Sequence, residues 1–190
     1  MRRRTSIILA GLLIAVLGWQ AYLYRFHLRH VPAEMNVWQR LYVSEESRGF
    51  GPGGNETGIL LYAMPDAARA EIEAAGEAYL ESFGPSPWGT LQGRFTDWHA
   101  TPIDPDVAPW ANPDTCPCGV SDRAMISYPR GCPSITGYLA RYGFTIRVRA
   151  DVEALANAAL FAEGAYYSFG RTGLIIVIPS EARIIFAYAG

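Results

Sequence analysis

The side chains with the greatest chemical potential lie in one proline-rich segment, residues 84–135. It holds all three cysteines, nine of the thirteen prolines and His99, the only histidine after residue 30. A segment of this length without a regular hydrophobic repeat is uncommon inside a compact domain and is usually functional or disordered. Its tryptophans argue against disorder. Trp88, Trp98 and Trp110 are therefore candidates for contact with a partner, although buried core positions would suit them equally.

The three cysteines of this segment predict one disulfide. Cys116 and Cys118 form a C-x-C pair, and Cys132 follows fourteen residues later. Outside the cytoplasm, the simplest account joins Cys132 to Cys116 or Cys118, which closes a loop of about fifteen residues and stabilises the fold by about 3 kcal/mol. A redox dithiol is the alternative, but its usual spacing is C-x-x-C rather than C-P-C.

A zinc site is another use for the same cysteines. It would need a fourth ligand, and His99, Asp97 or Asp114 is the available choice. The spacing of these residues matches none of the common zinc-binding patterns. We therefore expect neither a metal nor a cofactor.

Three carboxylates and an imidazole occur within ten residues of one another: Asp97, His99, Asp104 and Asp106. Such groups can bind a divalent cation or act as a general acid and base. The prolines between them bend the chain, but Asp-Pro pairs are also ordinary turn formers. The simplest interpretation is a solvated turn with a surface histidine. A serine triad would also have to use His99, and no G-x-S-x-G motif supports one.

Composition excludes several classes of function. All sixteen basic residues are arginine, so Schiff-base chemistry, pyridoxal phosphate anchoring and the P-loop lysine are excluded. Residues 31–190 contain 11 arginines and 18 acidic residues, which gives a net charge of −7. A body of that charge is expected to repel nucleic acid and anionic lipid headgroups.

Residues 7–24 contain no charged side chain and predict a transmembrane helix. Eighteen helical residues rise about 27 Å, close to the roughly 30 Å of a bilayer core. Arginines at positions 2–4 precede the segment, and Trp19, Tyr22 and Tyr24 lie at its other end, as at a headgroup layer. The basic start places the N-terminus in the cytoplasm and the body in the periplasm. A cleaved signal peptide is the alternative, but suitable small residues do not follow the apolar run cleanly.

The remaining sequence predicts three regions and one domain. Residues 1–30 form the anchor, and residues 31–57 form a juxtamembrane helix, from Pro32 to Leu41 or Tyr42, followed by a glycine-rich linker. Residues 58–190 form an extracytoplasmic α+β domain that carries the insert at 84–135.

Apolar runs in the domain predict its strands and helices. The strands are expected at residues 59–64, 144–148, 165–169, 174–178 and 183–188. One helix begins at Pro65 and Asp66 and ends at Gly84, and another is capped by Asp151 and ends before Gly164. The last two strands should form a central C-terminal hairpin in a mixed or antiparallel sheet of four or five strands. We expect the two helices to cover at least one face of that sheet.

These features favour a membrane-anchored interaction or accessory module for another membrane or periplasmic protein. The alternative is an anchored enzyme, either a hydrolase that uses His99 with Asp97, Asp104 or Asp106, or a thiol oxidoreductase that uses the cysteines. An inhibitor or immunity protein would have the same features as the first class. Because few catalytic side chains are present, the interaction module is the preferred hypothesis.

Overall fold

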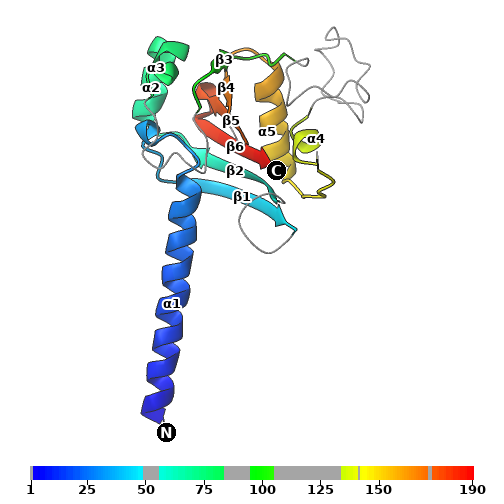
Figure 1. Ribbon diagram of the computed structural model, residues 1–190. Coiled ribbons are helices and arrows are strands. Elements are labelled where there is room, and N and C mark those ends of the chain that lie inside the picture. The colour runs from blue at the N-terminus through cyan, green and yellow to red at the C-terminus, as the bar shows by residue number, and fades with distance from the viewer. Residues whose placement is uncertain (1, 49–55, 84–94, 105–133, 141, 171–172) are drawn as a thin grey trace.

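The computed structural model describes residues 2–48, 56–83, 95–104, 134–140, 142–170 and 173–190. Its domain is an α+β fold built on one six-stranded sheet, in the order β1-β2-β6-β5-β4-β3, and a long helix, α1 (Arg2–Leu28), leaves it at one end (Figure 1). Every neighbouring pair of strands is antiparallel. The predicted class is confirmed, but the expected number of strands is wrong. The sheet has two edge strands that the sequence did not predict, β1 (Arg40–Ser47) and β3 (Trp98–Ala100).

The four central strands coincide with predicted apolar runs. They are β2 (Glu56–Ala63), β6 (Arg183–Ala189), β5 (Gly173–Ile178) and β4 (Tyr166–Phe169). A 3-10 turn, η2 (Pro179–Glu181), joins β5 to β6, which confirms the predicted C-terminal hairpin. Every residue of β5 is buried, so its sequence is a continuous apolar run rather than an alternating one.

Helices cover both faces of the sheet (Figure 1). They are α2 (Asp66–Ala75), α3 (Glu77–Glu81), α4 (Ile135–Leu139) and α5 (Ala150–Phe161). Helices α4 and α5 pack on the face that carries Leu174 and Ile176, whereas α2, α3 and the residues after α1 pack on the face that carries Ile175 and Val177. Successive side chains of β5 therefore enter two separate cores, one on each side of the sheet.

The region after α1 differs from its prediction. In place of a helix to Leu41 or Tyr42, it has one 3-10 turn, η1 (Ala33–Met35), and then strand β1. Asn36 ends the turn in a left-handed conformation, with φ of 51°. The Tyr24 phenol holds the following backbone extended, because it donates to the Trp38 carbonyl at 3.0 Å and accepts from the Arg40 N–H at 3.1 Å. Of the predicted linker, residues 44–47 belong to β1, 56 and 57 to β2, and 49–55 lie outside the described residues.

Residues 144–148 do not form the predicted strand. Their side chains alternate in burial as expected, with Phe144 buried, but side chains of β1 rather than a neighbouring strand bind their backbone. The Ser44 hydroxyl donates to the Arg147 carbonyl at 2.9 Å, and the Thr145 N–H donates to the Glu46 carboxylate at 3.0 Å. Alternating apolar residues thus mark a segment packed beside the sheet, not one paired within it.

The predicted helix from Asp66 breaks at Gly76 into α2 and α3. Gly76 has φ of 58° and ψ of −131°, a conformation open almost only to glycine. An added Cβ would also lie 3.0 Å from the Tyr166 hydroxyl. Ile72 of α2 and Leu80 of α3 are both buried in the same core.

We expect Gly76→Ala to lower the free energy of unfolding by about 1–3 kcal/mol, because the side chain strains this backbone conformation. Urea unfolding of the full chain in detergent, followed by circular dichroism, measures the effect. Gly164→Ala is the matched control, since Gly164 has φ of 100° but nothing within 4 Å of an added Cβ, and so it reports backbone strain without the contact. Unchanged stability of Gly76→Ala would mean that the break is not required.

Candidate functional site

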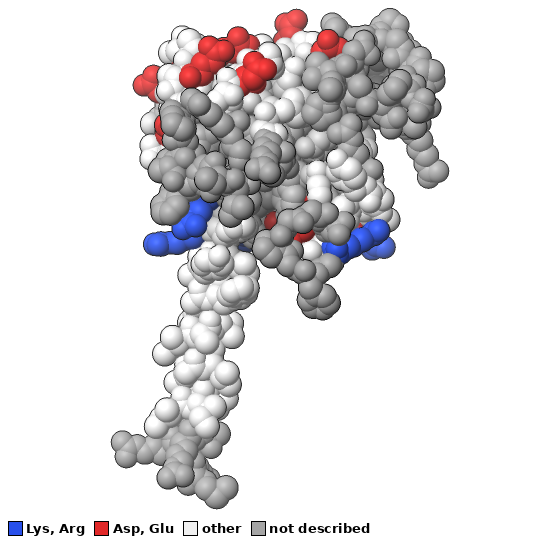
Figure 2. All heavy atoms as spheres, viewed as in Figure 1, with Lys and Arg blue, Asp and Glu red and all other residues white. Residues whose placement is uncertain are grey.

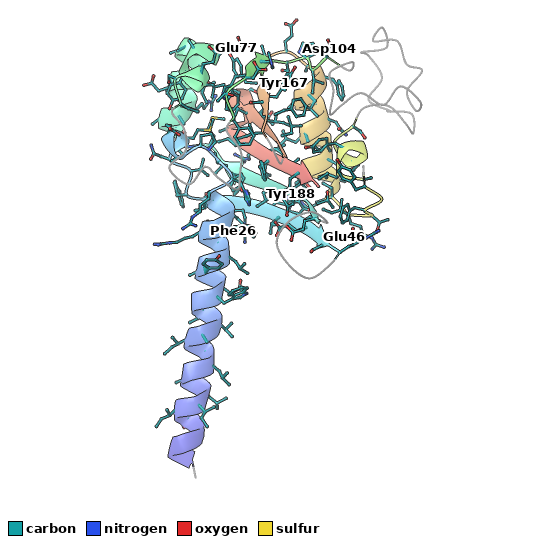
Figure 3. The ribbon with its side chains drawn as sticks, in the orientation of Figure 1. Phe26, Glu46, Glu77, Asp104, Tyr167 and Tyr188 are labelled. Carbon is teal, nitrogen blue, oxygen red and sulfur yellow. The ribbon has the colours of Figure 1, made fainter. Side chains whose placement is uncertain are left out.

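The predicted Asp97, His99 and Asp104 do come together, around Tyr167 of β4. The Nε2 atom of His99 lies 3.4 Å from a carboxylate oxygen of Asp97, and its ring lies 5.4 Å from that of Tyr167. The Tyr167 phenol bonds to the backbone of Asp104, and burial followed by the charges of Asp104 and Asp97 raises its pKa. Tyr167 and Asp104 lie at the end of the domain away from α1, as does Glu77, whose carboxylate accepts from the Ala100 N–H at 2.6 Å (Figure 3).

This group is open to solvent. The His99 side chain is 50% exposed and that of Asp97 is 85% exposed. A carboxylate can orient an imidazole as a general base, but an exposed pair is also the ordinary geometry of a surface ion pair. Within the described residues, no three or more His, Cys, Asp or Glu side chains gather in a way that could hold a metal ion.

Of the remaining candidates from the sequence, one is buried and the others lie outside the described residues. Trp98 is 2% exposed and belongs to the core, where its ring lies near those of Phe83 and Phe95. It is therefore not available for contact with a partner. The candidates outside the described residues are Trp88, Trp110, Asp106, Asp114, Cys116, Cys118 and Cys132.

A second polar cluster, which the sequence analysis missed, lies where α1 meets the sheet. His27 of α1 contacts Arg40 through Nδ1 and lies 3.2 Å from a carboxylate oxygen of Glu45 through Nε2. Because a guanidinium only donates, Nδ1 must accept and Nε2 must carry the proton shared with Glu45. The Tyr188 hydroxyl donates to the other oxygen of Glu45 at 2.7 Å. We call His27, His30, Arg40, Glu45 and Tyr188 the junction cluster.

The junction cluster joins the end of α1 to the core of the domain. The Tyr62 hydroxyl, at a buried position of β2, donates to the His27 carbonyl at 2.6 Å. The His30 ring stacks on Phe186 of β6, with 4.6 Å between ring centroids and 8° between ring planes. Val31, the next residue, is 5% exposed. The last turn of α1 and the residues after it are thus part of the folded domain.

The environment of the cluster keeps the His30 imidazole neutral and the Glu45 carboxylate ionised. Burial and then the nearby His27 lower the pKa of His30 to about 4. Burial raises the pKa of Glu45, but the hydrogen bonds from His27 and Tyr188 outweigh it, and the pKa falls below its ordinary value. Burial raises the pKa values of Tyr62 and Tyr188. These shifts are typical of a structural hydrogen-bond network, and the cluster has no side chain poised as a nucleophile.

The charges of the domain are distributed unevenly. Figure 2 shows acidic side chains along the end away from α1 and basic side chains at the level where α1 leaves the domain. We call the first group the distal acidic surface. Its exposed members include Glu71, Glu73, Glu77, Glu81, Asp97 and Asp104.

Neither the polar group around Tyr167 nor the junction cluster has a known counterpart that assigns its role. No family model matches the chain, and no similar protein is found among the curated proteins or the solved structures.

Proposed function

We propose that this protein is a membrane-anchored extracytoplasmic module that binds another envelope protein through its distal acidic surface. The observation that carries this proposal is the insertion of the end of α1 into the core of the domain. An anchor fixed in this way sets both the height and the orientation of the domain above a membrane.

The apolar part of α1 supports a retained anchor over a cleaved signal sequence. Residues Ser6–Leu28 form an apolar span of 23 residues that rises about 35 Å. No residue in its most apolar stretch is buried in the domain. Its aromatic rings extend the apolar surface toward the domain: Trp19 stacks on Tyr22, and Tyr22 stacks on Phe26. Cleavage after Gly18 would leave these rings on a short exposed stub, whereas a bilayer interface would cover them.

The junction leaves no flexible linker between the anchor and the domain. The hydrogen bond from Tyr62 to the His27 carbonyl and the stacking of His30 on Phe186 both tie α1 to the sheet. The distal acidic surface is therefore held at one height above the membrane. A fixed height suits contact with a second membrane protein and not the long reach of a tethered domain.

The charge of the distal acidic surface indicates the chemistry of the partner. It includes carboxylates from α2, α3 and the segment around β3. Within the described residues, Arg69 is the arginine that lies among these carboxylates, and it pairs with Glu73 at 2.7 Å. Complementary charges steer association and orient the complex. We expect a partner that presents a basic surface at the same height.

Site-specific photo-crosslinking in living cells tests the proposal. A photoreactive amino acid is placed at Ala70 or Ala78, which are exposed on α2 and α3, and as matched controls at Ala154 or Ala158, which are exposed on α5. We expect the first pair to crosslink to one membrane protein and the second pair not to do so. Equal crosslinking from all four positions, or from none, would contradict the proposed surface.

The proposed topology has its own test. A reporter that is active only outside the cytoplasm, fused after Gly190, should be active, and a reporter that requires the cytoplasm should be inactive there. The reverse result would place the domain in the cytoplasm.

A further inference from the structure

The end of the domain nearest α1 carries a set of exposed arginines. The described carboxylates of the distal acidic surface lie at the other end and do not pair with them. Basic side chains flank the point where α1 leaves the domain (Figure 2). They come from the last turn of α1 and the residue after it, from the residue after β1 and from the segment before α5. The arginines are Arg25, Arg29, Arg48, Arg147 and Arg149, all of them exposed.

Contacts with β1 place the arginines before α5 beside that strand. The Arg149 N–H donates to the Tyr42 hydroxyl at 3.1 Å, and its guanidinium lies 4.9 Å from the centre of the Tyr42 ring. The Arg147 carbonyl accepts from Ser44 at 2.9 Å. The guanidinium of Arg48, just after β1, lies 5.2 Å from the centre of the Phe144 ring. Strand β1 and residues 144–149 therefore share one surface.

Exposed apolar side chains lie on the same strand and the residues that lead into it. Trp38 is 69% exposed, and Leu41 is 38% exposed. The bond from Tyr24 to the Trp38 carbonyl places Trp38 at the level of the last residue of the uncharged run. Tryptophan and arginine together are typical of a protein surface at the headgroup layer. We call Trp38, Leu41 and the five arginines the basal surface.

Three acidic residues near the basal surface already have partners. Glu45 is held by His27 and Tyr188 in the junction cluster. Glu46 accepts from Arg48 at 3.2 Å and from the Thr145 N–H, and Asp151 pairs with Arg149. Among the described residues, Arg25 and Arg147 form no ion pair. The basal surface therefore carries positive charge that these ion pairs do not neutralise.

We propose that the basal surface docks on the headgroups of anionic phospholipids in the leaflet from which α1 emerges. The proposal rests on the membrane anchor proposed above. Guanidinium groups bind phosphate oxygens through paired hydrogen bonds, and each basic residue near an anionic surface favours the docked state about fivefold. The net charge of −7 suggested repulsion, but charges act over about 8 Å in physiological salt, so the distal acidic surface is screened from the bilayer.

Hydrogen–deuterium exchange of the full chain in lipid nanodiscs tests this docking. Discs of phosphatidylcholine alone are compared with discs that also contain phosphatidylglycerol. We expect backbone amides of residues 40–48 and 144–149 to exchange about tenfold more slowly in the anionic discs. The difference should disappear in high salt and in the variant Arg48→Gln/Arg147→Gln/Arg149→Gln. Arg69→Gln, on α2, is the matched control and should behave like the unmodified chain.

Each outcome of this experiment decides one point. Equal exchange in both kinds of disc, or slower exchange that survives in the triple variant, overturns docking through these arginines. Resistance of the chain to carbonate extraction from membranes reports the anchor separately. Extraction by carbonate overturns the anchor and the docking together, whereas resistance without a lipid effect overturns the docking alone.

Discussion

Replacing Trp98 with alanine is expected to lower the free energy of unfolding by about 3–5 kcal/mol. The side chain is 2% exposed and meets Phe83 edge-on, with 6.4 Å between ring centroids. Trp98 is the buried residue of strand β3, whose other two residues are exposed, so it supplies the contact of this strand with the core. Urea unfolding of the full chain in detergent, followed by circular dichroism, measures this loss of stability. The helical signal of α1 is expected to stay constant during the transition.

Two further tryptophan variants make this measurement specific. Trp38→Ala removes a ring that is 69% exposed, and we expect a change of no more than about 0.5 kcal/mol. Trp98→Phe should lose less than Trp98→Ala, since the Nε1 atom has no hydrogen-bond partner among the described residues and its removal breaks no bond. Trp98→Phe also gives a measurable change in the free energy of unfolding if Trp98→Ala does not fold. Equal stability of Trp98→Ala and Trp38→Ala would place Trp98 outside the core and return it to the candidates for partner contact.

The centre of the sheet was predictable from the sequence, and its edges were not. Strands β2, β5 and β6 bury both faces and therefore appear as continuous apolar runs between turn residues. Strand β1 has the sequence RLYVSEES, is half-exposed, and is a strand because it pairs with β2. Strand β3 has too few residues for any periodicity. The edge strands depend on tertiary contacts that no local pattern contains.

The polar group around Tyr167 could be predicted in part from the sequence, whereas the junction cluster could not. Asp97 and His99 are two residues apart, so their proximity could be predicted from the sequence alone. The junction cluster brings together residues from α1, β1 and β6, up to 161 positions apart between His27 and Tyr188, and no spacing in the sequence signals it. The available clue was the position of His27 and His30, which lie three residues apart directly after the apolar run and share one side of a helical turn.

The stability of the domain is expected to fall by about 3 kcal/mol as the pH drops from 6.5 to 4, mainly through His30. Burial and then the neighbouring His27 lower the pKa of this imidazole from 6.5 to about 4. Below pH 6.5 the His30 imidazole binds a proton in the unfolded chain, whereas in the folded chain it does so only below about pH 4. The unfolded state is therefore favoured by about 1.4 kcal/mol for each pH unit in this window.

The other groups that face His30 act on the same transition. Glu45 of β1 and His27 of α1 are the titratable neighbours, and Tyr188 of β6 stacks 6.2 Å from the His30 ring. The pKa of Glu45 lies below its ordinary value of 4.5, so this carboxylate stabilises the fold above that pH. Its contribution is lost as the pH falls through the lowered pKa. Glu45 thus adds to the loss only at the acidic end of the window.

His30→Phe should remove most of this pH dependence. Phenylalanine can keep the stack on Phe186 but cannot take up a proton, and it removes an Nδ1 atom that is buried without a hydrogen-bond partner among the described residues. The variant should be at least as stable as the unmodified chain at pH 7.5 and should be more stable by about 3 kcal/mol near pH 4. Urea unfolding at one-unit pH intervals measures both differences.

His99→Gln is the matched control, since the His99 side chain is 50% exposed and lies at the opposite end of the domain. This variant should lose stability between pH 6.5 and 4 in parallel with the unmodified chain. A parallel loss in His30→Phe instead would show that His30 does not carry the transition. Because His30 joins α1 to the sheet, the same series of measurements also reports how firmly the domain holds the end of α1.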